Sequence, residues 1–193
     1  MRPTMKTTVN TLPVLDERVR KTATVLAATL LIAACAHVSF PLWFTPVPVT
    51  LQPFAVLLLG LMLSPGMAAT TMLLYLAEGA MGLPVFTPHG LGGLAQLLGP
   101  TGGYLLSYPM VAAGVSWLWR RGSRSMGRTL AITAAGSLGT LAMGALWMML
   151  LTHAGLTVLL AHTVLPFLPG DAVKVVTAAT LACSWQRVRS AQR

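Results

Sequence analysis

Acidic residues are nearly absent from this sequence: Asp and Glu together account for four of its 193 residues. Charged residues of both signs make up 9% of the chain, whereas soluble domains carry about 25%. Hydrophobic residues make up 55%, and the mean hydropathy is +0.73. The scarcity of charge excludes an ordinary soluble domain, and the composition predicts an integral membrane protein.

Further absences limit the chemistry of the chain. Cys35 and Cys183 are its only cysteines, and both lie in apolar segments, where we interpret them as small hydrophobic side chains. The histidines do not show the spacing of metal ligands, so we predict no metal site and no cofactor. No G-x-x-x-x-G-K-S/T phosphate-binding loop is present, which excludes ATP hydrolysis by the chain itself.

The basic residues give a net charge of +9, which would suit either nucleic acid or a membrane surface. They sit in three short clusters that flank apolar stretches, and this placement argues against nucleic acid. Six spans would put all three clusters on one side of the membrane, which the positive-inside rule makes the cytoplasmic side. The clusters contain every basic residue except Lys174: Arg2, Lys6, Arg18, Arg20, Lys21, Arg120, Arg121, Arg124, Arg128, Arg187, Arg189 and Arg193.

At about 20 residues per span, the chain has room for six transmembrane helices and no soluble domain. The apolar run that ends at Cys35 resembles a lipoprotein signal peptide, but more membrane follows it, so we interpret it as the first span. The predicted fold is an all-α bundle surrounded by lipid, with basic cytoplasmic segments at 1–21 and 187–193 and a six-helix domain at 22–186. We expect a multi-pass protein with both termini on the cytoplasmic side of its membrane. The predicted spans cover residues 22–38, 52–64, 67–81, 104–119, 129–152 and 170–186.

On the external side, the predicted spans are joined by loops of unusual composition. Prolines at 41, 46 and 48 prevent a helix over residues 40–50, which predicts an extended loop. Residues 82–103 are rich in glycine and proline yet apolar between them, and such a backbone has to pack on protein or line a cavity. Residues 153–164 would continue the fifth span or form a loop helix against the bundle. These structured loops predict a small-molecule pocket that opens outward.

The same side carries an acid and a base in a segment that otherwise lacks charge. Pro166 and Pro169 are expected to end any helix before Gly170. A helix that starts there places Asp171 and Lys174 on one face of its first turn. A buried ion pair with only a structural role is costly and is often replaceable by apolar residues. We therefore predict that the pair binds a ligand; the alternative is a pair that only steadies the start of the helix.

Four segments with distinctive sequences follow one another along the chain. They are 45–53 (TPVPVTLQP), 79–86 (GAMGLPVF), 98–104 (LGPTGGY) and 165–174 (LPFLPGDAVK). Together they resemble the BioY family, the biotin-binding S components of energy-coupling factor (ECF) transporters, over roughly residues 22–186. The resemblance implies the S-component fold, capture of biotin from outside, and coupling to a transmembrane T component driven by ABC-type ATPases. It also implies a transport protein and not an enzyme.

Biotin offers a ureido group with N–H donors and a C=O acceptor, an apolar ring and a carboxylate tail. Asp171 accepts hydrogen bonds and Lys174 donates them, so the pair suits the ureido group, while Lys174 also suits the carboxylate. The resemblance supports both residues without deciding which end of biotin each one holds. Thr101 and Gly102 would offer backbone N–H groups to a carboxylate at the start of a span.

Four more residues complete the predicted site, each with an alternative role. Phe86 and Tyr104 would cover the apolar ring of biotin or pack at the membrane interface. Gln52 would bond the ligand or serve the start of its own helix. Glu78 would contact the ligand, the glycine-rich loop or the lipid headgroups.

Small residues form two surfaces suited to close helix contact. In the fifth span, Gly136, Thr140 and Gly144 share one face. In the first span, a small-residue surface would meet the T component or the protein's own helices; it contains Ala23, Ala27, Ala28, Ala33 and Ala34.

Two other functions are alternatives to ligand capture. An intramembrane enzyme would use Glu78 or Asp171 as acid or base, but the sequence shows no paired nucleophile and base by spacing. A channel or structural bundle would pass ions or hold its shape without binding a ligand. Recovery of the ligand unchanged and the absence of ion flux would oppose both.

Overall fold

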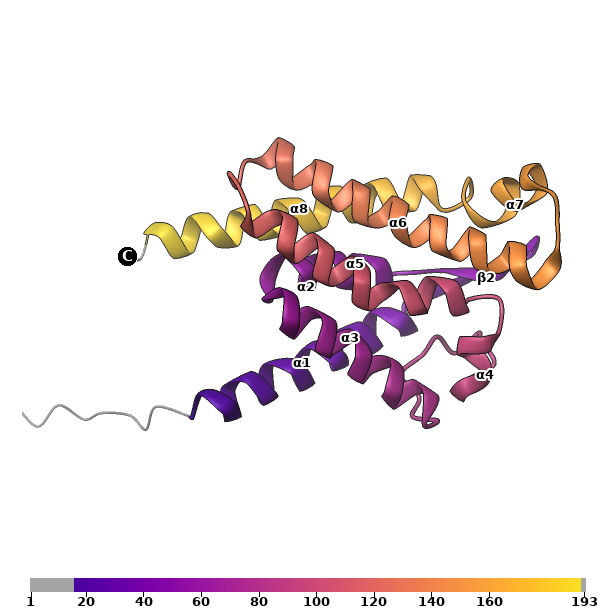
Figure 1. Ribbon diagram of the computed structural model, residues 1–193, viewed down its shortest axis with the longest axis horizontal. Coiled ribbons are helices and arrows are strands. Elements are labelled where there is room, and N and C mark those ends of the chain that lie inside the picture. Colours follow the sequence, from indigo (N-terminus) through magenta and orange to yellow (C-terminus); the bar gives the residue numbers. More distant parts are fainter. Residues whose placement is uncertain (1–15, 192–193) are drawn as a thin grey trace, which may run out of the picture.

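The computed structural model describes residues 16–191, which form eight helices and one two-stranded hairpin (Figure 1). Arg2, Lys6 and Arg193, which belong to the predicted basic clusters, lie outside the described residues. Helices α1, α2, α3, α5, α6 and α8 run over the six predicted spans. In chain order the elements are α1 (Glu17–His37), β1 (Ser39–Leu42), β2 (Thr45–Thr50), α2 (Gln52–Met62), α3 (Pro65–Ala80), α4 (Gly93–Leu98), α5 (Gly102–Arg120), α6 (Met126–Thr152), α7 (Leu156–Thr163) and α8 (Leu168–Ala191).

The helices of the described part differ in their capacity to cross a membrane. Helices α1 and α6 are each long and apolar enough, and α7 with α8 makes a third span if this pair, bent by 52°, is taken as one. Helix α2 is apolar but has only 11 residues. At a rise of about 1.5 Å per residue, it covers only about half of the hydrocarbon core. Strand β2 continues the path of α2 toward one end of the bundle (Figure 1).

The proline-rich segment forms an antiparallel hairpin, so the prediction of an extended loop is confirmed. Ser39 pairs with Thr50 and Leu42 pairs with Thr45, with a register shift between these pairs. Proline fits this segment because each strand of a two-stranded sheet has a free edge, where no backbone N–H is needed. The segment 153–164, read as a span continuation or a loop helix, contains the separate helix α7.

The last helix begins two residues earlier than expected. Helix α8 starts at Leu168, so Pro169 lies inside its first turn, where a missing N–H breaks no helical hydrogen bond. The N–H of Asp171 bonds the carbonyl of Phe167 at 2.8 Å. The expectation that the prolines delay the helix until Gly170 is therefore wrong, although Asp171 still lies in its first turn.

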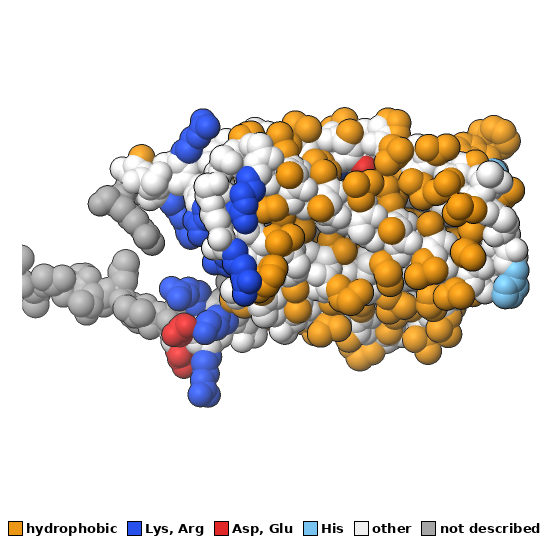
Figure 2. Space-filling view, turned by 45° about the horizontal axis from the view of Figure 1, so that its top comes forward, with side chains coloured by type: hydrophobic (Ala, Val, Ile, Leu, Met, Phe, Trp, Pro, Cys, Tyr) orange, Lys and Arg blue, Asp and Glu red, His pale blue; other side chains and the backbone are white. Residues whose placement is uncertain are grey.

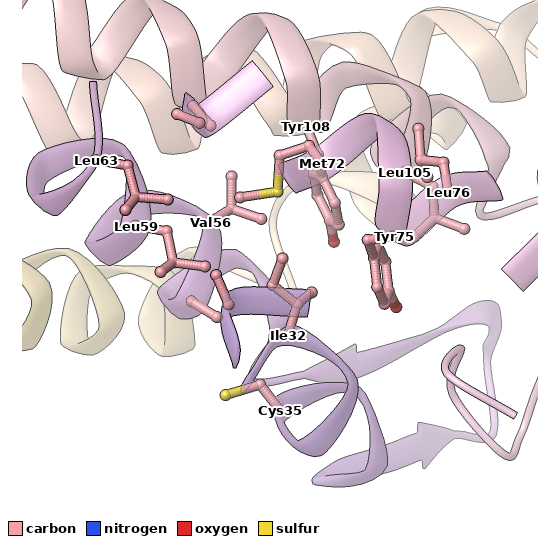
Figure 3. Packing of buried hydrophobic residues seen from close by; sticks show 14 of the residues in the cluster. Ile32, Cys35, Val56, Leu59, Leu63, Met72, Tyr75, Leu76, Leu105 and Tyr108 are labelled. Carbon is pink, nitrogen blue, oxygen red and sulfur yellow. The ribbon is translucent and has the colours of Figure 1, made fainter. Parts of the chain in front are cut away.

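Helix α5 packs against α6, α3 and α2. The largest buried cluster joins α1, α2, α3 and α5, and Figure 3 shows its side chains converging between these helices. Helix α2 approaches α5 so closely at Gly60 that a Cβ there would lie 3.0 Å from the carbonyl oxygen of Ala112. The cluster includes Ile32, Cys35, Val56, Leu59, Leu63, Met72, Tyr75, Leu76, Leu105 and Tyr108.

Charged side chains are unevenly distributed over the surface. Figure 2 shows Lys and Arg gathered at one end, a broad hydrophobic surface over the body, and His at the other end. The basic end holds the start of α1, the connection between α5 and α6, and the end of α8 (Figure 1). The opposite end holds the hairpin, α4 and α7 (Figure 1). The described members of the three basic clusters therefore share one end of the molecule.

Candidate ligand-binding site

A cavity lies toward the hairpin end of the bundle, where segments distant in the sequence meet. Its volume is about 40 Å³, which is small beside the roughly 300–1,000 Å³ of typical ligand pockets. A ligand that needs a pocket of that size therefore has to displace side chains or loop segments. The polar lining residues are Thr50, Gln52, Thr87, Gln96, Thr101, Tyr104, Tyr108, Thr140, Asp171 and Lys174. The apolar lining residues are Val47, Pro48, Pro53, Phe86, Leu105, Leu141 and Phe167.

The acid and the base of α8 form a buried ion pair in this cavity. The Nζ atom of Lys174 lies 2.8 Å from Oδ1 of Asp171, and the two residues are 7% and 5% exposed. The second carboxylate oxygen, Oδ2, accepts a hydrogen bond of 2.7 Å from the hydroxyl of Ser137 on α6. The pair is therefore held from two helices at once.

This pair keeps hydrogen-bonding capacity for a ligand. A lysine ammonium group has three donors, and among the described residues only Asp171 accepts one from Lys174. Each oxygen of Asp171 accepts one side-chain bond, and a carboxylate has about four acceptor positions. The pair as a whole is neutral, so it can donate to one ligand atom and accept from another.

Gln52 lines the cavity, but its amide group is used within the protein. Its Nε2 donates to the hydroxyl of Tyr75 at 2.6 Å, and its Oε1 accepts from the hydroxyl of Thr50 at 3.1 Å. The hydroxyl of Tyr75 in turn donates a hydrogen bond to the carbonyl of Val85 at 3.0 Å. Gln52 therefore connects the hairpin and α2 to α3 and the glycine-rich loop, and its side chain does not cap the start of its own helix.

The glycine-rich loop contributes Phe86 and Thr101 to the cavity wall. Phe86 packs edge-on against Tyr75, with ring centroids 5.4 Å apart, and it fills the space beside Gly79, where a Cβ would collide with its ring. The hydroxyl of Thr101 accepts a bond of 2.8 Å from Nε2 of Gln96. The Oε1 atom of Gln96 accepts from the N–H of Gly92 at 3.1 Å. Gln96 therefore shapes this loop from inside.

Tyr104 spans the space between α5, α6 and α7. Its hydroxyl donates to the carbonyl of Thr163 at 2.7 Å, and a Cβ at Gly144 would collide with its ring. Its ring centroid lies 6.2 Å from that of Phe167. The ring thus forms part of an aromatic wall, while the hydroxyl holds the end of α7.

Glu78 and Gly102 were predicted to belong to the binding site, but neither residue lines this cavity. Glu78 lies on α3, and its Oε1 accepts a bond of 3.3 Å from the hydroxyl of Thr29 on α1. The N–H of Gly102 bonds the carbonyl of Gly99 at 3.0 Å, so the turn itself uses the donor that was expected to face a carboxylate. Within residues 16–191, no group of three or more His, Cys, Asp or Glu could hold a metal ion.

Two cavity residues whose hydroxyl groups lack a partner in the described chain, Tyr108 and Thr87, were not predicted from the sequence. Tyr108 is 2% exposed, and its hydroxyl bonds no other described residue. The buried hydroxyl of Thr87 also has no partner within the described chain. Helical spacing could have identified Tyr108, because it lies four residues after Tyr104 and so shares its face of α5. Thr87 had no comparable signal.

Known proteins resemble this chain over most of its length. A family model described as the BioY family matches residues 5–191. A protein named probable biotin transporter BioY from Pyrococcus horikoshii is 37% identical over 137 residues, which cover 71% of this chain and 79% of that protein. The biotin transporter BioY of Rhodobacter capsulatus is 37% identical over 169 residues, or 81% and 87% of the two chains.

A solved structure shares the fold described above. It is a crystal structure of the S-component for biotin from an ECF-type ABC transporter. The two structures align with a TM-score of 0.81 at 25% sequence identity, covering 88% of this chain and 92% of the other. The arrangement of helices around the cavity is therefore that of an S component, which is an all-α membrane fold.

Proposed function

The chain belongs to the BioY family, and on this premise we propose that it is the biotin-binding subunit of a vitamin uptake transporter, capturing biotin at the hairpin end of the bundle. It is a transport protein and not an enzyme. The observation that carries the proposal is the buried pair of Asp171 and Lys174 in a cavity walled by the hairpin and the glycine-rich loop.

The charge of the pair favours the ureido group of biotin as its partner. The ureido group is neutral and carries donors and an acceptor side by side, which matches Asp171 and Lys174 standing 2.8 Å apart. The carboxylate of biotin would meet the negative charge of Asp171 in the same place. Phe86, Tyr104 and Phe167 would cover the apolar ring, and Thr101 at the loop wall would lie nearer the tail.

Binding to the purified full-length protein tests this proposal. We expect saturable biotin binding that Asp171→Ala weakens by about 100-fold or more, because bonds to charged groups contribute about 1.5–3 kcal/mol each. Glu17→Ala is the matched control, since it breaks the exposed pair that Glu17 forms with Lys21 at 2.7 Å in α1. Equal binding by the Asp171→Ala variant and the wild type would overturn the site.

A second variant separates binding from folding. Replacing both members with apolar residues (Asp171→Leu with Lys174→Met) avoids a lone buried charge, and such replacements are often neutral for stability. We expect this double variant to unfold at a temperature close to that of the wild type and to bind no biotin. Thermal unfolding in detergent and isothermal titration measure the two properties.

Biotin derivatives test which end of the ligand meets the pair. Biotin methyl ester keeps the ureido group and loses the negative charge, whereas 2-iminobiotin replaces the ureido group with a positive guanidinium group. If the ureido group meets Lys174, the wild type discriminates against 2-iminobiotin, and Lys174→Met reduces that discrimination. If the carboxylate meets Lys174, the variant instead loses its preference for biotin over the ester.

The coupling partners belong to the same proposal. The chain lacks a phosphate-binding loop, so we propose that a T component and ABC-type ATPases energise uptake in the cytoplasmic membrane, with both termini of this chain cytoplasmic. On α1, Ala28 is buried and Ala33 is half-buried against the bundle, whereas Ala23, Ala27 and Ala34 are exposed. The exposed alanines are the part of the small-residue surface that would meet the T component.

A further inference from the structure

A second hollow lies at the basic end of the molecule, away from the cavity that holds Asp171. It is bounded by the ends of α2 and α5 and by the last turns of α8, and its volume is about 380 Å³. We call it the basic groove and define it by Met62, Trp119, Arg120, Arg124, Trp185 and Arg189. Nothing in the proposed capture of biotin uses it.

Among residues 16–191, the three arginines of the basic groove have no carboxylate partner. The chain has four acidic residues, of which Asp16 caps α1 and Glu17 pairs with Lys21. The other two, Glu78 and Asp171, bond Thr29 and Lys174. The groove therefore presents three positive charges that the protein's own side chains do not neutralise, which favours an anionic occupant.

Tryptophan rings orient two of these guanidinium groups. Arg124 lies over the ring of Trp119 at 4.8 Å, and Arg189 lies over the ring of Trp185 at 5.4 Å. Arg120 donates to the hydroxyl of Ser116 at 3.3 Å. The side-chain oxygen of Gln186 also accepts from Nε and Nη1 of Arg124. A guanidinium group stacked on a ring presents its remaining N–H groups at its edge, and such an edge matches the oxygens of a phosphate in a bidentate arrangement.

Figure 2 shows that the hydrophobic surface of the molecule borders its basic end. The groove combines both kinds of side chain, because arginines, tryptophans and Met62 line it. Exposed apolar side chains continue from it along α8, among them Leu181, Trp185 and Val188, and Met62 of α2 is exposed beside them. An occupant that matches the groove thus combines a phosphate with acyl chains. We propose that the basic groove binds the headgroup of an anionic phospholipid, whose chains lie along the apolar surface of α8.

An acidic segment of a partner protein would satisfy the same arginines. It would not account for the apolar surface that continues from the groove toward the body of the bundle, where lipid is the surrounding medium. The lipid is therefore the occupant that both the charge and the exposed apolar side chains favour, and the acidic segment is a competing outcome of the test.

Native mass spectrometry of the full-length protein in detergent tests the proposal with phosphatidylglycerol and phosphatidylcholine as probes. We expect the wild type to retain phosphatidylglycerol at least about tenfold better, and the triple variant R120Q/R124Q/R189Q to lose this preference. The matched control R18Q/R20Q/R121Q removes the same number of charges at the same end but outside the groove. It should keep the preference.

Several outcomes would overturn the proposal. Equal loss of the preference for phosphatidylglycerol in both triple variants would show a general effect of net charge and no specific lipid site in the groove. Displacement of the lipid by inorganic phosphate at similar concentrations would show a site for a free anion, and displacement by a poly-glutamate peptide would favour a protein segment. Thermal unfolding of each variant, which does not depend on biotin binding, verifies that it folds.

Discussion

The energetic balance of a buried ion pair explains why Asp171 and Lys174 are better suited to binding than to holding the fold. Removing both charges from water costs several kcal/mol per ion, about as much as their attraction returns. Ser137 adds a second bond to the carboxylate at 2.7 Å, but the ammonium group has one described acceptor. A ligand that supplies acceptors and donors would therefore lower the free-energy cost of burying the two charges.

Tyr108 provides a residue-scale test of the cavity. Tyr108 is a buried residue that lines the cavity, and its hydroxyl bonds no other described residue, so Tyr108→Phe should leave the unfolding temperature nearly unchanged. If this hydroxyl bonds biotin, the variant should bind about 3- to 10-fold more weakly, because a neutral hydrogen bond contributes about 0.5–1.5 kcal/mol. Isothermal titration and thermal unfolding in detergent measure both effects.

Tyr75→Phe is the control for this variant. The Tyr75 hydroxyl accepts from Gln52 at 2.6 Å and donates to Val85 at 3.0 Å. Its removal leaves buried groups unpaired, which costs about 1–3 kcal/mol, so this variant should lower the unfolding temperature. If the two substitutions changed the biotin affinity equally, or lowered the unfolding temperature equally, a ligand-facing role for Tyr108 would be contradicted.

At the scale of elements, the packing of α6 on α5 positions the aromatic wall of the cavity. A Cβ at Gly144 would collide with the ring of Tyr104, whereas a Cβ at Gly139 would meet Val111 at 3.8 Å, an ordinary contact. Gly144→Ala should therefore cost about 1–3 kcal/mol through overpacking. It should also weaken biotin binding, because Tyr104 would shift away from Thr163.

Gly139→Ala is the matched control in the same helix. Its new methyl group has room, and alanine favours a helix over glycine by up to about 1 kcal/mol, so the variant should be as stable as the wild type or slightly more stable. Equal destabilisation by both substitutions, measured by unfolding in detergent, would show that the contact with Tyr104 does not decide the packing.

The small residues of α6 illustrate what the sequence could predict. Gly136 and Gly144 were expected to face a neighbouring helix, and both face α5. The proline-rich segment was expected to be extended because proline excludes a helix there, and it forms the hairpin. These predictions succeeded because each rests on the local sterics of glycine and proline.

The failures concern contacts between distant segments. Glu78 lies in α3 directly before the motif segment 79–86, but the direction of its side chain depends on how α3 packs against α1, where it meets Thr29. Gly102 was expected to offer its N–H to a ligand, but the turn from Gly99 uses it. The start of α8 was misplaced because Pro169 was read as a helix stop, although proline fits the first turn of a helix.

For the whole molecule, the two proposed sites divide between its ends. The cavity with Asp171 lies on the side of the hairpin, where few charges are exposed, and the basic groove lies where the arginines gather (Figure 2). This separation allows ligand capture on one side of a membrane and contact with anionic headgroups on the other. It requires that the basic end faces the cytoplasm, as the positive-inside rule predicts.

Cysteine labelling in spheroplasts tests this orientation. Trp43, in the turn of the hairpin, is 95% exposed, and Ser123, between α5 and α6, is exposed at the basic end. A membrane-impermeant maleimide should label Trp43→Cys in intact spheroplasts and Ser123→Cys only after lysis. Cys35 and Cys183 are both buried, so the unsubstituted protein serves as the background. Labelling of Ser123→Cys before lysis, with Trp43→Cys protected, would reverse the orientation and place the biotin cavity on the cytoplasmic side, which is incompatible with capture from outside.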